Sequence, residues 1–490
     1  MSSRSPLLAG VDVGTTHIKA LISDTEGTVL ARAVRRTPVA PGHRHPADDV
    51  LAAALGALTD CADATGRPPD AIGVTGMAET GAPLDRDGRP LGALRAWSDP
   101  EPAPYAHSLG ARLGSEALHR ATGILPSGKV PLAKWCALAA QETLTAARMR
   151  AWAGAADLLV HALTGRLGTD ATFAQRTMAW DPHHKRWIEE LLAEAGLTTR
   201  HMPLVHPPGD PVGTVTRAVA LRHRLRAGTP VVVAGHDHLV GAWAAGVHTA
   251  GQVADSMGTA EAVLTVSATP PDQAAAAEEG MSWGRHADGE HFIVLAGMRG
   301  SGALVEWFCD RFLTGASGGD RYAAFESLAR SLPATPTGLV LTPYPGGRTA
   351  PRPDPHATLD LRGLGLDHGP AEMARAVLEG TAHHARWMAD VQATVCGAAP
   401  DSVTLLGGST RLRPWTELKA AASPWPTRVC AEPEAPALGA AHWAGASLGL
   451  DPAAATAPSD PIVPDPTTAE AHRTFHHERF LAAVAPTTPP

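Results

Sequence analysis

The sequence predicts an α/β protein of two similar domains, on three observations. A Gly-Thr turn occurs twice, at Gly14-Thr15-Thr16 and at Gly258-Thr259. Each turn lies between two apolar, strand-like runs: 7–11 and 18–23 around the first turn, 251–254 and 262–266 around the second. After the first turn, the pattern continues with a third strand (28–35) and a helix (47–63). We therefore expect one domain to begin at each Gly-Thr turn.

The βββα order at the start narrows the fold class. An acidic residue, Asp12, ends the first strand, and this opening is typical of actin-like (ribonuclease H-like, ASKHA) ATPase domains rather than of a Rossmann unit. No Gly-x-x-x-x-Gly-Lys-Ser/Thr segment occurs, which argues against a Walker-type nucleotide site. The sequence therefore predicts two actin-like domains with an active-site cleft between them.

Each Gly-Thr turn has the composition of a phosphate-binding turn. Glycine lets backbone N–H groups approach an anion without a Cβ atom in the way, and threonine hydroxyls add further donors. An ordinary glycine-containing hairpin is the alternative interpretation of either turn taken alone. The duplication and the strand order favour two phosphate-binding turns that contact one polyphosphate.

Length and composition exclude several classes of protein. A chain of 490 residues can form two to three domains, and 44% hydrophobic with 18% charged residues is typical of a globular protein. The net charge of −8 argues against non-specific binding to nucleic acid. The five cysteines show no Cys-x-x-Cys spacing, so neither a zinc site nor a disulfide framework is expected. No signal peptide precedes the first strand and no apolar run reaches about 18 residues, so we expect a cytoplasmic protein.

The first half of the chain contains two more strands that end in polar loops. Strand 71–76 leads into Met77-Ala78-Glu79-Thr80, and strand 230–234 leads into Gly235-His236-Asp237-His238 followed by a helix (239–245). Helices are expected between them at 103–113, 132–148, 155–163 and 187–195. Because α/β folds place their chemistry at the carboxyl ends of strands, Asp237 is a candidate for a reacting group.

Dispersed motifs then resemble those of one family, in the family's order. They are Asp12-Val13-Gly14-Thr15-Thr16-His17-Ile18-Lys19, Trp97-Ser98-Asp99, Leu163-Thr164-Gly165, Arg176-Thr177, Pro343 to Pro351, Arg362-Gly363-Leu364, Ala374 to Gly380, Leu406-Gly407-Gly408-Ser409 and Glu434 to Ala441. Along nearly its whole length the chain resembles the FGGY carbohydrate kinases. The resemblance implies an ATP- and Mg²⁺-dependent enzyme that phosphorylates a sugar or polyol.

The resemblance also implies roles for the two aspartates. Asp237 matches the family's catalytic aspartate, which accepts a proton from the sugar hydroxyl as the bond to the γ-phosphorus forms. Its alternative role is that of a helix N-cap. Asp12 is expected to hold Mg²⁺ directly or through water, the alternative being an aspartate that forms the turn.

Nucleotide contacts are expected from both halves of the chain. Gly14, Thr15 and Thr16 in the first half, with Gly258 and Thr259 in the second, are expected to bind the β- and γ-phosphates. Gly407 and Gly408 follow strand 403–406, where they would let the adenosine lie against the backbone. A simple strand-to-helix turn is the alternative for this glycine pair.

The expected sugar-binding residues are Met77, Glu79, Thr80, Asp237 and His238. Xylulose kinases typically have Met-His-Gly where this chain has Met77-Ala78-Glu79, whereas Glu79-Thr80 is similar to the Arg-Glu-Thr segment of glycerol kinases, with Ala78 in place of the arginine. A carboxylate pairs well with vicinal hydroxyls and repels an acid, so a neutral ketose or polyol of five or six carbons is expected. Glu79 as an exposed loop residue and His238 as a packing residue remain the alternatives.

The domains and partners follow from these assignments. Domain one is expected at 1–247 with the sugar site and the base, domain two at 248–450 with most nucleotide contacts, and 451–490 as a poorly ordered tail with one short helix (470–484). The expected partner is a small sugar or polyol, with neither nucleic acid nor membrane, and a homodimer is one of the oligomeric states considered. Two alternatives stay open: an actin-like nucleotide-binding protein, and a non-catalytic sugar sensor of kinase descent.

Overall fold

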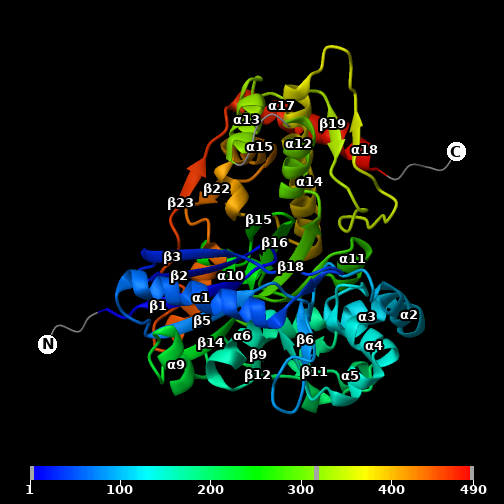
Figure 1. Ribbon diagram of the computed structural model, residues 1–490. Coiled ribbons are helices and arrows are strands. Elements are labelled where there is room, and N and C mark those ends of the chain that lie inside the picture. The colour runs from blue at the N-terminus through cyan, green and yellow to red at the C-terminus, as the bar shows by residue number, and fades with distance from the viewer. Residues whose placement is uncertain (1–4, 314–318, 486–490) are drawn as a thin grey trace. The chain divides into compact units, whose positions relative to one another are not determined.

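The computed structural model describes residues 5–313 and 319–485, and these form two compact units (Figure 1). Unit 1 comprises Met1–His248, Ser282–Phe292 and Glu434–Ala457, and unit 2 comprises Thr249–Met281, Ile293–Pro433 and Pro458–Pro490. The start of the chain (1–4) and the Pro-Thr-rich end of the expected tail (486–490) lie outside the described residues.

Unit 1 is built on a sheet with the strand order β13-β14-β5-β1-β2-β3. Strand β1 pairs antiparallel with β2 and parallel with β5, and β5 pairs parallel with β14. The strands are β1 (Leu8–Val13), β2 (His17–Ser23), β3 (Val29–Arg36), β5 (Ala71–Gly76), β13 (Pro211–Thr214) and β14 (Pro230–His236). The central strands β1 and β5 are buried along their whole length, as their continuous apolar runs predict.

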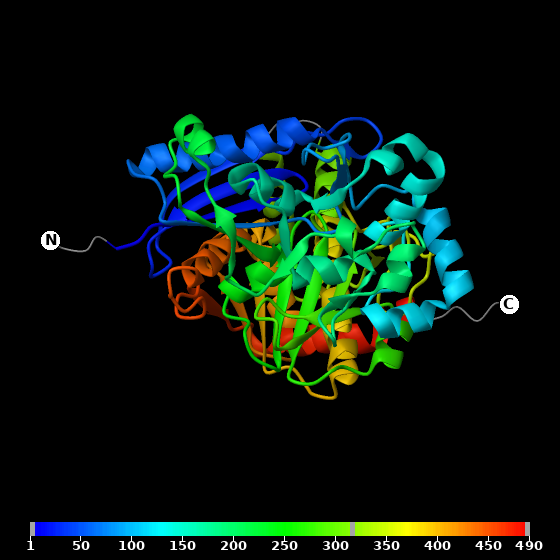
Figure 2. The same ribbon diagram turned by 90° about the horizontal axis from the view of Figure 1, so that it is seen from below.

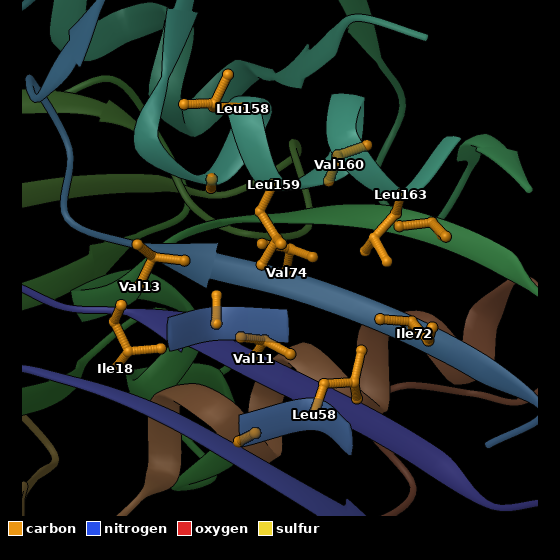
Figure 3. Packing of buried hydrophobic residues seen from close by; sticks show 14 of the residues in the cluster. Val11, Val13, Ile18, Leu58, Ile72, Val74, Leu158, Leu159, Val160 and Leu163 are labelled. Atoms are coloured by element: carbon orange, nitrogen blue, oxygen red, sulfur yellow. The ribbon is translucent and has the colours of Figure 1, made fainter. Parts of the chain in front are cut away.

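Helices cover both faces of this sheet. Helices α1 (Ala47–Thr65) and α6 (Ala155–Thr164) contribute Leu58, Leu159 and Leu163 to the core on one face, and Figure 3 shows these side chains directed toward those of β1 and β5. Helix α16 (Ala435–Ala446) lies on the other face, so that in Figure 2 the blue α1 and the orange α16 flank the dark blue strands.

Helix α16 approaches the backbone of the sheet directly. A Cβ atom at Gly10 of β1 would lie 1.7 Å from the carbonyl oxygen of Ala437, and one at Gly73 of β5 would lie 1.8 Å from that of Ala440. Only glycine fits at such contacts, so these two strand glycines mark where the helix packs.

Unit 1 contains further strands and helices besides these. They are β4 (Arg44–His45), β6 (Gly81–Leu84), β7 (Leu94–Arg95), α2 (Ala103–Leu113), α3 (Ser115–Thr122), α4 (Pro131–Gln141), α5 (Thr143–Arg148), β8 (Ala151–Gly154), β9 (Gly168–Asp170), α7 (Ala171–Ala174), β10 (Trp180–Asp181), β11 (Arg186–Trp187), α8 (Glu189–Ala193), β12 (Leu204–His206), α9 (Arg217–His223), α10 (Asp237–Ala244) and β17 (Ser282–Arg285).

Unit 2 repeats the same strand arrangement. Its strands follow the order β18-β16-β15-β21-β22-β23, with β15 antiparallel to β16 and parallel to β21. They are β15 (Gln252–Met257), β16 (Glu261–Ser267), β18 (Phe292–Met298), β21 (Ser402–Leu406), β22 (Thr427–Cys430) and β23 (Ser459–Ile462). The β15–β16 hairpin holds the second Gly-Thr turn in the place that the β1–β2 hairpin holds the first. The two actin-like α/β domains expected from the sequence are confirmed.

The other elements of unit 2 are mainly helices. They are α11 (Gln273–Glu278), α12 (Gly302–Phe312), α13 (Gly319–Arg330), β19 (Val340–Thr342), β20 (Asp360–Arg362), α14 (Pro370–Cys396), α15 (Arg413–Ala422), α17 (Pro466–Phe475), a π-helical turn (His476–Phe480) and α18 (Leu481–Val484).

Three expectations differ from the structure. The helix expected at 132–148 is two helices, α4 and α5, separated at Glu142. Residues 282–292 and 434–450, expected in the second domain, and 451–457, expected in the tail, belong to unit 1, in which α16 packs on β1 and β5. Residues 458–485 are no loose tail: β23 pairs with β22, and Phe475 and Phe480 are buried in a hydrophobic cluster.

Candidate active site

Three neighbouring strand ends bring the candidate residues of unit 1 to one edge of the sheet. Strands β1, β5 and β14 run parallel and adjacent, with Asp12 opposite Thr75 and His236 opposite Gly76. The turn after β1, the loop after β5 and the start of α10 after β14 therefore emerge together. This edge is where the sequence predicts the chemistry.

Asp237 lies at the first position of helix α10, directly after β14. The helix N-cap is His236, so the alternative role of Asp237 as the N-cap is not what the structure shows. Its Oδ1 accepts a hydrogen bond from the backbone N–H of His238 at 2.7 Å, and 21% of the side chain is exposed. A carboxylate in this position can receive a proton from a bound hydroxyl.

Asp12 and Asp237 both have raised pKa values, which favour the protonated form of each carboxyl group. Burial raises the pKa of Asp12 to about 7, helped by the negative charge of Asp237 and opposed by Lys19. Burial likewise raises the pKa of Asp237 to about 7, opposed by the backbone N–H of His238 and helped by the charge of Glu79. Carboxyl groups with such raised pKa values near neutral pH are typical of functional sites.

Asp12 fits the requirements of a magnesium ligand. Its side chain is buried, and its Oδ1 has no hydrogen-bond partner among the described residues. A buried carboxylate oxygen without a donor is suited to a hard cation, and Mg²⁺ prefers a few carboxylates with phosphate oxygens. His236, Asp237 and His238 also place three potential ligand atoms within 4.8 Å of one another, but two imidazoles suit softer ions better than Mg²⁺.

The first Gly-Thr turn is braced by its surroundings. Thr37 donates a hydrogen bond from Oγ1 to the carbonyl oxygen of Gly14 at 2.7 Å, and Thr15 Oγ1 accepts one from the indole of Trp97 at 2.9 Å. Thr16 is exposed. A Cβ atom at Gly14 would lie 2.7 Å from the carbonyl oxygen of His17, so the turn requires glycine.

Unit 2 presents the second turn and the glycine pair beside each other. Strand β15, which leads to Gly258 and Thr259, pairs with β21, which leads to Gly407 and Gly408. Gly407 has a φ of 99°, and a Cβ atom there would lie 2.5 Å from the carbonyl oxygen of Met257. Thr259 is exposed, and a Cβ atom at Gly408 would meet open space. Both features leave room for a ligand.

The loop after β5 holds Glu79 in an unusual conformation. Glu79 has a positive φ of 56°, and its side chain is only 10% exposed, so it is no exposed loop residue. Arg176 donates to its Oε1 from Nε at 2.9 Å and from Nη2 at 2.5 Å. The fully buried Lys134 of α4 donates to its carbonyl oxygen at 2.5 Å. Two cations therefore fix this residue by its carboxylate and by its backbone.

These cations also determine the charge of Glu79. Burial acts to raise its pKa, but the positive charges of Arg176, Lys129 and Lys134 and the hydrogen bond from Arg176 outweigh burial and lower the pKa. Burial lowers the pKa of Lys134 to about 7. The sequence-based argument against an anionic sugar treated Glu79 as the one charge of the loop, and the surrounding cations weaken that argument.

The other expected sugar-binding residues differ in how accessible they are. Met77 and Thr80 are buried, and Thr80 Oγ1 accepts a hydrogen bond from the backbone N–H of Trp97 at 3.0 Å, which gives its hydroxyl a structural partner. His238 is partly buried, and burial lowers its pKa to about 4, so its imidazole is neutral at pH 7. A neutral imidazole can donate or accept one hydrogen bond at a sugar hydroxyl.

Three contacts at this edge were not indicated by the sequence. Arg176, in the 3₁₀ turn Gln175–Thr177, was noted only as part of a motif, and Lys134 was not noted at all. Lys19 pairs with Glu434, which precedes α16, at 2.5 Å. Each of these contacts joins elements far apart in the chain, so no local pattern indicates them.

Two family models together match most of the chain. Residues 7–244 match the N-terminal domain of the FGGY family of carbohydrate kinases, and residues 253–448 match its C-terminal domain. Similar proteins include xylulose kinases of Streptomyces coelicolor (28% identical; 93% of this chain, 91% of the relative) and Escherichia coli (27%; 84% of each). A glycerol kinase of Rhodospirillum rubrum is 29% identical over 82% of each chain.

Solved structures of carbohydrate kinases are also similar to this chain. The xylulose kinase of Rhodospirillum rubrum has a TM-score of 0.83 at 26% identity and covers 97% of this chain and 98% of its own. A gluconate kinase of Lactobacillus acidophilus reaches 0.86 at 21% identity, covering 97% and 96%, and so shares the fold. Within the described part of the chain, no helix has the length and apolarity needed to span a membrane. The chain belongs to the FGGY family of carbohydrate kinases, and it is a phosphotransferase.

Proposed function

We propose that this kinase uses ATP and Mg²⁺ to phosphorylate a hydroxyl of a neutral ketose or polyol of five or six carbons, with Asp237 as the general base. One observation carries the proposal: the buried Asp12 and the partly buried Asp237 lie at one sheet edge, each with a pKa raised to about 7. One of them can serve a metal ion and the other a proton transfer.

The proposed chemistry is an in-line transfer. The substrate oxygen forms a bond to the γ-phosphorus of ATP while the bond from that phosphorus to the bridging oxygen breaks, and ADP leaves. Asp237 accepts the hydroxyl proton as the new bond forms, and the proton is later released to water. Mg²⁺ bound by Asp12 would neutralise charge on the phosphates.

Each Gly-Thr turn is proposed to bind phosphate. In unit 1, the backbone of Gly14 and Thr15 with the exposed hydroxyl of Thr16 would donate to phosphate oxygens, and in unit 2 Gly258 and Thr259 would do the same. Gly407 and Gly408 would accommodate the adenosine, since a side chain at Gly407 would collide with the backbone of β15.

The substrate is proposed to bind at the loop after β5. Arg176 occupies Oε1 of Glu79, which leaves Oε2 to accept a substrate hydroxyl, and the lowered pKa keeps this carboxylate ionised. His238, on the neighbouring element, would contact a second hydroxyl. The relatives named xylulose kinases, at 27–28% identity, support a ketose.

A sugar acid is the second candidate, and the charges around Glu79 favour it. Arg176 and Lys129 both lower the pKa of Glu79, and Lys129 lies over the ring of Trp97 at 5.6 Å. Relatives named gluconokinases are 21% identical to the chain. A substrate carboxylate could pair with the guanidinium of Arg176 or the ammonium group of Lys129 near this loop.

A coupled assay of ADP release over ketoses, aldoses, polyols and sugar acids tests the proposal. We expect one neutral ketose or polyol to give the highest kcat/KM. The highest kcat/KM for a sugar acid would support the second candidate. ATP hydrolysis that no sugar stimulates would contradict kinase activity and support an actin-like nucleotide-binding role.

A further inference from the structure

Unit 2 contains a buried cluster of charges next to its Gly-Thr turn. Lys419 of α15 places its Nζ 2.7 Å from Asp255 Oδ2 and 2.7 Å from Glu261 Oε1. The three side chains are 3%, 4% and 0% exposed, respectively. Burial acts to lower the pKa of Lys419, but the two carboxylates raise it overall, so the ammonium group is charged.

The two carboxylates lie on the strands that flank the turn. In the β15–β16 hairpin, Met257 pairs with Glu261 and Asp255 pairs with Val263. Asp255 and Glu261 are therefore diagonal neighbours on one face of the hairpin, two positions apart. A single ammonium group that bonds to both joins the strands close to Gly258 and Thr259 and fixes their register.

A second set of contacts joins this cluster to helix α12. Ser301, just before α12, donates a hydrogen bond from Oγ to Glu261 Oε2 at 2.7 Å. The first backbone N–H groups of the helix bind the turn itself: Gly302 N donates to the carbonyl oxygen of Gly258 at 3.1 Å, and Ala303 N to that of Thr259 at 3.0 Å. The turn is thus held from two sides, by α15 through Lys419 and by α12.

We infer that Lys419 is a positioning residue for ATP use, because it holds the turn Gly258-Thr259 in the geometry that binds phosphate. A buried ion pair adds little net stability compared with apolar side chains of similar size, since desolvation of the charges offsets their attraction. Fixing a geometry is its better attested effect. The inference rests on the proposed function, in which this turn contacts the nucleotide.

The charge of the cluster supports the same role. Without Lys419, the hairpin would carry two buried carboxyl groups within a few residues of a turn that must accept an anion. Burial and the charge of Asp255 raise the pKa of Glu261 to about 7, against the opposing effect of Lys419. Lys419 therefore provides both the link between the strands and the compensation of their charge.

The test uses a variant that removes all three charges together. Lys419→Met alone would leave two buried carboxylates without a counter-charge, so it is combined with Asp255→Asn and Glu261→Gln. The matched control combines Arg375→Met with Glu379→Gln in α14. Arg375 is equally buried, pairs with Glu379 at 3.5 Å and bonds to the carbonyl oxygens of Ala329 and Ala334, away from the hairpin.

We expect the triple variant to raise KM for ATP at least about tenfold, with KM for the sugar changed by less than about twofold. Backbone amides of 253–261 should exchange hydrogen faster in this variant than in wild type. The control should lower thermal stability and leave KM for ATP unchanged. If the triple variant gave this same result, the role of Lys419 would be purely structural.

Two results separate failure of this inference from failure of the proposed function. If the triple variant keeps the wild-type KM for ATP while Thr259→Val raises it, Lys419 has no positioning role and the turn still binds ATP. If Thr259→Val also leaves KM for ATP unchanged, the assignment of the turn itself is wrong. Equal increases in both KM values for the triple variant would also overturn the inference.

Discussion

The negative charge of Asp237 contributes to the raised pKa of Asp12, although Asp12 lies on β1, Asp237 follows β14, and β5 separates these two strands. The relationship arises from the parallel order β14-β5-β1, which ends three strands at one edge. Two carboxyl groups that interact in this way titrate as a pair. Any change at one aspartate is therefore expected to affect the protonation of the other.

Activity should depend on pH through this pair. Because the base must be ionised and its pKa is raised to about 7, we expect kcat/KM to rise as the pH increases through about 7 and to be lost below it. A profile from pH 5 to 9, with stability checked at each pH, measures this. A rate that stays constant down to pH 5 would show that no group with such a pKa controls the reaction.

The same raised pKa predicts a gain of stability when the base is removed. The folded state binds a proton at Asp237 more tightly than the unfolded state, in which the pKa is near 3.8, so stability falls as the pH rises from about 4 to about 7. We expect Asp237→Asn to unfold at a temperature a few degrees above wild type at pH 8, and with little difference at pH 4. Equal melting temperatures at pH 8 would argue against a buried, destabilising carboxylate.

The contact between Arg176 and Glu79 predicts an effect on the sugar alone. Glu79→Gln and Arg176→Gln should each raise KM for the preferred sugar about tenfold or more, with KM for ATP within about twofold of wild type. Arg176→Lys should recover only part of the loss, because lysine cannot donate from two adjacent nitrogens to one carboxylate. Initial rates with each substrate varied in turn decide this, and unaltered sugar kinetics in Glu79→Ala would remove Glu79 from the site.

Changes in the Gly-Thr turns are expected to affect ATP rather than the sugar. Gly14→Val would place a branched side chain where even a Cβ atom would lie 2.7 Å from a carbonyl oxygen, and Thr259→Val removes a hydroxyl donor while retaining the shape. Both should raise KM for ATP much more than KM for the sugar. If KM for the sugar rose and KM for ATP did not, the turns would have to be assigned to sugar binding instead of phosphate binding.

The fold was predictable because its signals are local. The strands on both sides of Gly14 and Gly258, and the strand-to-helix junction at Asp237, are visible as apolar runs and turns. The position of α16 was not predictable in this way, since an apolar helix pattern does not indicate which sheet it covers. The glycines at 10 and 73, within buried strands, were the available signal, because they permit close approach of a helix.

The site was predictable only in part, because some of its contacts come from elements distant in sequence. Asp12 lies near the end of one strand, and Glu79 and Asp237 follow two others. The ends of these strands must meet in a parallel sheet, so the proximity of the three residues follows from the strand order. Arg176 and Lys134 reach Glu79 from a 3₁₀ turn and from a helix distant in sequence. Only tertiary packing brings these two residues to Glu79. The sequence-based argument that Glu79 repels a sugar acid therefore did not include their positive charge.

The most direct test of the central claim is the turnover of purified Asp237→Asn with ATP and the preferred sugar. We expect kcat to fall at least about a hundredfold, the usual effect of losing a general base, while dissociation constants for sugar and for a non-hydrolysable ATP analogue stay within a few-fold of wild type. Turnover close to wild type in the folded variant would contradict the assignment of Asp237 as the general base.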